Sequence, residues 1–329
     1  MHLDPLAENF VVAKPIDQKD YKQAVLADLQ RRGALIGTRK RDGHKVIVEV
    51  CADKRVRLYS SGMHEIDHRL NYIREEVRTL RLPVGTLLIG ELAIERITDG
   101  NVVDDVTAIT SILGGSFHKA QQILARGTLP SLFVFQALHL QPQGLTWLSW
   151  EYRKTLRWLQ QLLWEGHYVV AVDEVMGPLS AMQEKVSSNG WEGLVLYDAD
   201  YRLTYRHGET AQRPKGCYKL KPIIEDDFFI RPDGRRFRED GVLKDVMLLQ
   251  WASHEKRRIL NCGRLGAFDA RMRQALSSMA DPKVLQVRFV SRYPKSGKLR
   301  ESAFMRLRDD KYPNECIASR VWPEAQYVQ

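Results

Sequence analysis

The sequence predicts an α+β domain built on antiparallel sheets with helices, followed by a smaller all-β barrel domain. Up to residue 222, apolar strand-like segments are separated by amphipathic helical segments, which favours an α+β domain. After residue 222 the chain changes to short strands with Gly-rich turns at Gly263 and Gly266. These two observations predict a first domain over residues 1–222 and a second over residues 223–329.

In the first domain, helices are expected where apolar residues recur at helical spacing between charged residues. Strands are expected where apolar residues alternate with polar ones or form short continuous runs. The expected helices are 18–32, 64–80 and 149–166, and the expected strands are 45–50, 56–60, 86–95, 131–140, 167–175 and 192–198.

In the second domain, strands are expected at 246–252 and 284–290, with one helix near 268–279. Short strands with a single helix fit a small barrel such as an OB-fold. The acidic segment 223–227 (IIEDD) is expected to be a short linker between the domains.

The composition is that of a protein with a substantial core. Of its 329 residues, 44% are hydrophobic and 28% are charged, which argues against a disordered chain. No apolar run approaches the ~20 residues needed to span a bilayer, and no signal peptide is evident at the start. The expectation is a protein that has no membrane partner, is not secreted and stays in the cytoplasm, as a monomer.

Lysine and arginine together outnumber the acidic residues by 50 to 41, which gives a net charge of +9. Basic residues are dense near positions 40, 235 and 295. A basic excess favours a polyanionic partner, most commonly nucleic acid, although basic faces also serve solubility alone. The four cysteines have no CxxC spacing, so we expect free thiols and no zinc site.

Lys40-Arg41-Asp42-Gly43 stands just before an expected strand, where a tight turn can project the lysine into a cleft. A lysine is a nucleophile only as the neutral amine, and neighbouring cations such as Arg39, Arg41 and Lys45 favour that form. Taken alone, this tetrapeptide fits an exposed basic turn better, because lysines usually lie on the surface.

Further polar residues interrupt apolar strands in a fixed order along the chain. Glu91 lies within Gly90-Glu91-Leu92, and Glu192 opens an apolar strand at 192–196. Lys219 and Lys221 alternate along an extended segment and would share one face. Residues 304–311 end in Arg308-Asp309-Asp310-Lys311. Each piece alone fits a solvated, salt-bridged surface, but their order together does not.

This ordered set resembles the ATP-dependent DNA ligases of the covalent nucleotidyltransferase superfamily, and most of all the small phage and bacterial ligases. The resemblance implies ATP as a cofactor, Mg²⁺ (or Mn²⁺) as the metal and nicked double-stranded DNA as the partner. It implies that Lys40 of motif I (KxDG) carries AMP, with nucleotide contacts from the neighbouring Thr38, Arg39, Arg41 and Lys45.

The other motifs imply further roles. Glu91 of motif III would lie at the AMP ribose or a metal, and Glu192 of motif IV would bind the metal. Phe135 of motif IIIa would stack on adenine. Lys219 and Lys221 of motif V would act as catalytic cations on the α-phosphate. Arg308 and Lys311 of motif VI (RxDK) would orient the leaving pyrophosphate.

The sequence departs from the family pattern at several positions. Lys45 stands where motif I has arginine, and Tyr197 stands where motif IV has lysine. Motif Ia, around Ser60 and Ser61, has no arginine, which Arg55 or Arg57 could replace. Ile89 and Gln136 replace the usual aspartates of motifs III and IIIa.

The predicted activity is sealing of 3′-OH/5′-phosphate nicks through lysyl-AMP and a DNA-adenylate, in replication, repair or recombination. Two alternatives stay open. One is an RNA ligase or mRNA-capping guanylyltransferase of the same superfamily, and the other is a non-catalytic DNA-binding protein with a relic site.

Overall fold

The computed structural model describes residues 10–66, 68–98, 100–125, 127, 129–141, 144–145, 150–203, 205–207, 213, 215–293, 296–319, 322 and 325–328. Contacts divide the chain into two compact units, Met1–Lys221 and Pro222–Gln329. Each unit has its own apolar cores. Among the described residues, no helix is both long enough and apolar enough to cross a bilayer.

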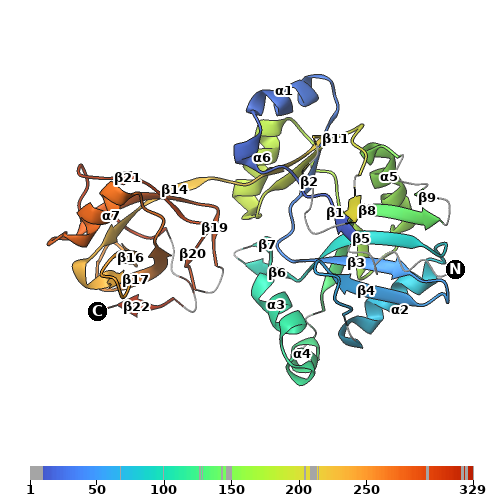
Figure 1. Cartoon of the computed structure of the whole chain (residues 1–329), viewed down its shortest axis with the longest axis horizontal. Coiled ribbons are helices and arrows are strands. Elements are labelled where there is room, and N and C mark those ends of the chain that lie inside the picture. The colour runs from blue at the N-terminus through green and yellow to red at the C-terminus, as the bar shows by residue number, and fades with distance from the viewer. Residues whose placement is uncertain are drawn as a thin grey trace. The chain divides into compact units, whose positions relative to one another are not determined.

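The first unit contains a six-stranded sheet in which only the pair β10–β8 is parallel (Figure 1). Its path runs in the order β10 (Val169–Ala171), β8 (Ser131–Gln141), β5 (Thr86–Ala93), β3 (His44–Val50) and β4 (Val56–Ser60), with β9 (Gly144–Leu145) paired to β8.

Both faces of this sheet are buried, because alternate residues of each strand point to opposite faces. Val46 and Val48 belong to a core with the helices α2 (Asn71–Thr79), α3 (Val106–Gly114) and α5 (Tyr152–Leu162). Ile47 and Ile89 face a second core, which the three-stranded antiparallel sheet shares. That sheet has the order β13 (Cys217–Leu220), β11 (Leu194–Asp198), β2 (Leu35–Arg39).

The remaining elements of the first unit extend these two sheets. Helices α1 (Gln23–Arg31) and α6 (Leu179–Asn189) add apolar residues to the shared core. The strands β6 (Glu95–Thr98) and β7 (Asn101–Asp104) form a hairpin next to α3 (Figure 1). The other elements are β1 (Phe10–Val12) paired with β12 (Tyr205–His207), α4 (Phe117–Leu124), and the 3₁₀ turns Gln18–Asp20 and His68–Leu70.

The second unit is built on a seven-stranded antiparallel sheet that surrounds a core with α7 (Ala270–Ser277). Its order is β21 (Ala303–Leu307), β18 (Lys283–Phe289), β14 (Ile224–Ile230), β16 (Leu243–Trp251), β17 (Ile259–Leu265), β22 (Tyr327–Val328), with β15 (Arg235–Phe237) on β16. A short pair, β19 (Ser291–Arg292) and β20 (Leu299–Arg300), and the 3₁₀ turns Pro232–Gly234 and Pro313–Glu315 complete it.

Two expected helices are present but shorter than predicted, and the expected linker is wrong, because nearby residues pair with strands. The helix expected at 18–32 begins only at Gln23, since Ile16 exchanges backbone hydrogen bonds with β13. The helix expected at 64–80 begins at Asn71, since the N–H of Ile66 donates to Leu58 O of β4. The expected linker 223–227 contributes Ile224–Asp227 to strand β14, which pairs along its whole length with β18.

Candidate functional site

A cavity of about 370 Å³ opens in the first unit and gathers most of the sequence-predicted site residues. Thr38, Arg39, Lys40, Arg41, Lys45, Glu91, Phe135 and Lys219 all line it. It is also lined by Ala13, Lys14, Pro15, Ser61, Gln136, Val172, Val195, Tyr197, Tyr201, Leu203 and Cys217.

Lys40 follows directly on the last residue of β2, at the start of a turn between the two sheets. Its backbone N–H donates to Gly193 O at 2.9 Å, which ties the turn to the start of β11. Gly43 ends the turn where a Cβ would collide with the carbonyl oxygen of Leu92 on β5. The KxDG turn therefore needs glycine for close backbone approach.

Glu192 joins the nucleophile candidate to motif V. Its side chain is 7% exposed, Oε2 pairs with Nζ of Lys40, and Oε1 lies 3.2 Å from Nζ of Lys221. A buried carboxylate requires such partners. The following residue, Gly193, has φ +151°, and a Cβ there would collide with the carbonyl oxygen of Leu220. Glycine is therefore needed directly after Glu192.

Glu91 and Lys45 lie directly opposite each other on β5 and β3. Burial raises the pKa of Glu91 to about 7, against the opposing effect of Lys40 and Lys45, and the charge of Glu192 adds to the rise. Burial also lowers the pKa of Lys45, while the charge of Glu91 acts in the opposite direction. The two carboxylates Glu91 and Glu192 therefore act on each other within one desolvated site.

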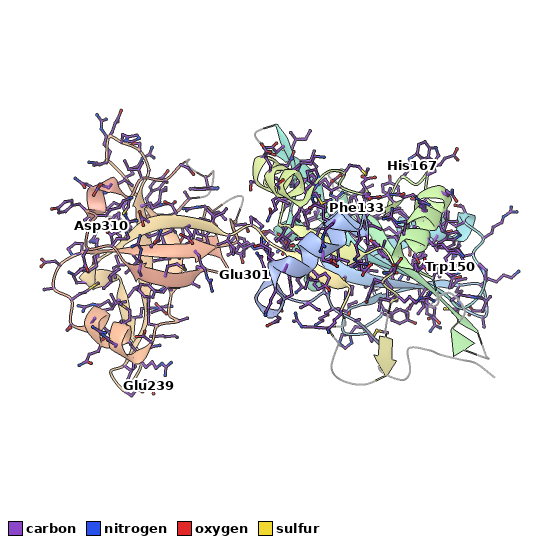
Figure 2. The ribbon with its side chains drawn as sticks, turned by 90° about the horizontal axis from the view of Figure 1, so that it is seen from above. Phe133, Trp150, His167, Glu239, Glu301 and Asp310 are labelled. Atoms are coloured by element: carbon purple, nitrogen blue, oxygen red, sulfur yellow. The ribbon has the colours of Figure 1, made fainter. Side chains whose placement is uncertain are left out.

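Arg39 and Arg41 flank Lys40, but carboxylates hold both of them. Nη2 of Arg39 lies 3.0 Å, and Nη1 of Arg41 3.2 Å, from Oδ1 of Asp104, and both arginines also contact Glu95. Arg41 lies over the ring of Phe133, 3.5 Å from its centroid (Phe133 is labelled in Figure 2). These ion pairs compensate the charges that the sequence suggested would act on Lys40.

Lys219 is held by the chain segment that precedes α1. Its Nζ lies 2.9 Å from Oδ1 of Asp17, and its backbone N–H donates to Ile16 O. Lys14, on the same segment, is exposed and lines the cavity. Lys219 and Lys221 contact different carboxylates, because Lys219 pairs with Asp17 whereas Lys221 pairs with Glu192.

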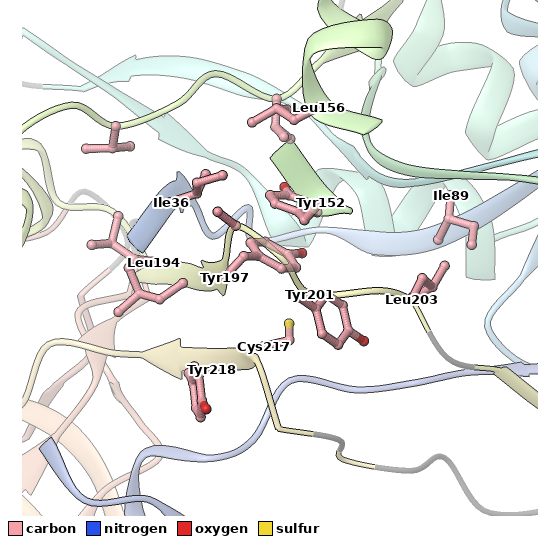
Figure 3. Close-up of a cluster of buried hydrophobic side chains, with 14 of the residues drawn as sticks. Ile36, Ile89, Tyr152, Leu156, Leu194, Tyr197, Tyr201, Leu203, Cys217 and Tyr218 are labelled. Atoms are coloured by element: carbon pink, nitrogen blue, oxygen red, sulfur yellow. The ribbon is translucent and has the colours of Figure 1, made fainter. Parts of the chain in front are cut away.

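The lining of the cavity includes the aromatic residues Phe135, Tyr197 and Tyr201, of which Figure 3 labels the two tyrosines. Tyr197 lines it and stacks on Tyr152, with ring centroids 3.6 Å apart. Phe135 is half-buried, and the neighbouring Gln136 is buried. An apolar wall with a few polar groups suits a flat heterocycle such as a nucleobase.

The structure shows where the residues lie that depart from the motif pattern described above. Ile89 is fully buried in the core shared by the two sheets, where a carboxylate would lack a partner. Ser61 lines the cavity, whereas Arg55 and Arg57 are not among its described lining residues. Arg55 instead pairs with Asp53 on the surface.

Arg308 and Lys311 lie in the second unit, where a buried carboxylate joins them. Nη1 of Arg308 lies 3.0 Å from Oδ2 of Asp227, and Nζ of Lys311 lies 2.6 Å from the same oxygen. Arg308 also donates to Asp310, at 2.8 and 2.9 Å (Asp310 is labelled in Figure 2). Both predicted cations of motif VI are therefore paired within their own unit.

Sequence reasoning missed Lys14, Asp17, Glu95 and Asp104. None lies in a motif or interrupts an apolar strand, so nothing in its neighbourhood distinguishes it from a surface residue. The described residues contain no cluster of three or more His, Cys, Asp or Glu side chains able to hold a metal alone.

Comparisons with known proteins define the fold. No protein-family model matches the chain, and no curated protein is similar to it in sequence. A structure of the Lig E DNA ligases is 15% identical over 91% of this chain and 99% of its own, with a TM-score of 0.60. The structure named Pmar-Lig_Pre is 14% identical over 91% of this chain and 67% of its own, with a TM-score of 0.61.

The ATP-dependent DNA ligase of bacteriophage T7, solved in complex with ATP, is 18% identical over 92% of this chain and all of its own, with a TM-score of 0.50. The chain therefore has the fold of these ligase structures, with an α+β domain on antiparallel sheets followed by an OB-fold domain. This confirms the predicted fold class. Within this fold, the motifs in the sequence resemble those of the ATP-dependent DNA ligases.

Proposed function

We propose that this chain is an ATP-dependent DNA ligase that seals nicks in duplex DNA. The contact that carries the proposal is that of Lys40 with Glu192, since Lys40 lines a cavity that is also lined by Lys45, Lys219 and Arg39. Lysine is a nucleophile at phosphorus only where cations stabilise the phosphate charge that develops. The ligase fold and the order of the six motifs support the same reading.

In the first step, Nζ of Lys40 leaves Glu192, gives its proton to solvent and attacks the α-phosphorus of ATP. An N–P bond forms, the bond to the β-phosphate oxygen breaks, and pyrophosphate leaves. The AMP then passes to the 5′-phosphate of the nick, and attack by the 3′-hydroxyl seals the strand and releases AMP. Lys219 and Lys221 compensate the α-phosphate charge, which is present in all three steps.

Arg39 supports a nucleotide in this cavity. Its Nε is buried and makes no hydrogen bond to the described residues, whereas Nη2 lies 3.0 Å from Oδ1 of Asp104 and Nη1 donates to Glu95. A buried donor without a partner is costly, so a phosphate or ribose oxygen would stabilise it. Thr38, with its side chain toward Val195 O, and Phe135 would contact the sugar and base.

The donor set fits Mg²⁺, and Mn²⁺ by the same chemistry. Magnesium takes one or two carboxylates and completes its shell with water and substrate phosphates. Glu192 and Glu91 offer two neighbouring carboxylates, the second with a pKa of about 7. Such an ion supplies charge compensation on the phosphate oxygens.

The remaining expectations belong to the same proposal. The partner is nicked double-stranded DNA, bound mainly through backbone phosphates because a nick can occur in any sequence. The net charge of +9 suits this partner. We propose a monomer that acts in the cytoplasm in DNA replication, repair or recombination.

The decisive experiment incubates the protein with α-labelled ATP or GTP and Mg²⁺, followed by a denaturing gel. ATP should label the wild type, and Lys40→Ala should fold but take no label, with peptide mapping placing the label on Lys40. The matched control is Lys54→Ala, an exposed lysine outside the cavity, which should label normally. Labelling by GTP, or sealing of RNA ends but not nicked DNA, would favour the sister enzymes instead, and a mapped label on another lysine would exclude the assignment.

A further inference from the structure

The β6–β7 hairpin presents two carboxylates to the residues on either side of Lys40. Glu95 begins β6 and Asp104 ends β7, and the antiparallel register pairs them at the open end of the hairpin. The two acids contact the same two arginines, Arg39 and Arg41. The hairpin leaves the end of β5, the strand that carries Glu91.

Asp104 differs from Glu95 in what it contacts and how deeply it lies. Oδ2 of Asp104 accepts the backbone N–H of Asp42 at 2.9 Å, whereas Oδ1 faces both guanidinium groups. Its side chain is 2% exposed, against 40% for Glu95. A buried ion pair keeps its partners in place, because removing one partner leaves an uncompensated buried charge.

The turn around Lys40 is therefore fixed from two sides. Gly193 O accepts the N–H of Lys40, and Asp104 accepts the N–H of Asp42. The side chains of residues 39 and 41 are fixed on the Asp104 side. A nucleophile must be held within a fraction of an ångström of its attack position, and ~1 Å of displacement can cost ~100-fold in rate.

The base of the hairpin is itself anchored. The N–H of Asp105 donates to Ile94 O at 2.7 Å, and the Asp105 side chain caps α3 by accepting from the N–H of Ala108. Asp104 is therefore the last residue of β7, directly before the residue that caps α3, and its carboxylate has little freedom to move.

We propose that Asp104 is a positioning residue for the reaction of Lys40, which it serves by orienting the turn 39–42 and compensating Arg39 and Arg41. This inference rests on the proposed ligase function and names a residue outside the six motifs. Loss of Asp104 is therefore expected to affect the steps that use Lys40 but not the sealing step, in which the lysine takes no part.

The test compares Asp104→Asn with Glu95→Gln and the wild type. Asp104→Asn should lower kcat of lysyl-AMP formation by about 10- to 100-fold, with KM for ATP changed by less than about threefold. Sealing of a nick that already carries AMP should stay within about threefold of the wild type. Glu95→Gln should lower kcat of lysyl-AMP formation less than Asp104→Asn does, because Glu95 is 40% exposed and its described hydrogen bonds reach the two arginines but not the backbone of the turn.

Each other outcome would overturn the inference. Normal lysyl-AMP formation by Asp104→Asn removes the role, and an equal loss in both assays assigns Asp104 to the stability of the whole unit. A raised KM at unchanged kcat assigns it to ATP binding. A wild-type protein that forms no lysyl-AMP would instead refute the proposed function, which keeps the two failures distinct.

Discussion

Glu192 is the residue through which the first unit joins its two lysine motifs. One oxygen contacts Nζ of Lys40 and the other lies 3.2 Å from Nζ of Lys221, while the side chain is 7% exposed. The loss of this one carboxylate should therefore disturb the nucleophile and the α-phosphate cation together.

We predict that Glu192→Gln lowers the rate of lysyl-AMP formation by about 100-fold or more, on the scale of ~3 kcal/mol for one electrostatic group. The amide keeps the size of the side chain but removes the charge. Single-turnover labelling across a range of Mg²⁺ concentrations measures the effect. Near wild-type rates throughout that range would show that the charge of Glu192 is not needed.

At the residue scale, the sequence predicts those site residues that are unusual for their local pattern, such as a carboxylate within an apolar strand. Glu91 and Glu192 stand out because each interrupts or opens an apolar strand, and Lys40 because it stands beside a glycine that allows close approach. Asp104 and Asp17 are not unusual for the sequence around them. Their partners are more than 60 residues away along the chain, so only the folded backbone reveals them.

At the element scale, the strands with a clear period were predicted best. The segment 56–60 matches β4, and the segment 131–140 matches all but the last residue of β8. The segment 167–175 contains only the short strand β10, and β2, α3, α4 and α6 were not predicted. The missed elements are stabilised by tertiary contacts, and the hydrophobic pattern of a single segment does not reveal such contacts.

Asp245 illustrates how one side chain links three strands of the second unit. It lies on β16, is 7% exposed, and accepts from Arg236 on β15, at 2.9 and 2.6 Å, and from Arg264 on β17. Burial alone would raise the pKa of Asp245, but the hydrogen bonds from the two arginines lower it below its ordinary 3.8.

We predict that Asp245→Asn destabilises the second unit by about 2 kcal/mol at pH 7, because two arginines lose a buried partner. A lowered pKa gives stability that is present above 3.8 and is lost as the pH falls through the folded value, so the wild type and the variant should converge below pH 3.8. Hydrogen–deuterium exchange of β15–β17 measures the difference. The exposed Glu239→Gln (Figure 2) is the control and should change exchange little; equal exchange in wild type and Asp245→Asn at pH 7 would contradict the prediction.

At the scale of the whole molecule, the proposed mechanism uses the cations of the two units at different steps. Lys219 and Lys221 belong to the first unit and would face the α-phosphate in every step. Arg308 and Lys311 belong to the second unit, where Asp227 pairs with both. Cations that orient pyrophosphate are useful only while it leaves, and DNA needs access afterwards. Rigid-body movement of one domain is the common solution to such a conflict.

We therefore predict that Arg308→Ala and Lys311→Ala lower lysine adenylylation by about 100-fold but change sealing of a pre-adenylylated nick by less than about threefold. Lys219→Ala should lower both, because the α-phosphate is present throughout. The two assays are run in parallel by single-turnover kinetics, with circular dichroism to verify folding. Arg306→Ala is the matched control, since Arg306 lies two residues before Arg308 and donates to Gln286 instead of Asp227. Equal losses in both assays for folded Arg308 and Lys311 variants would mean that the second unit acts on every step, and that its cations do not withdraw once AMP is on Lys40.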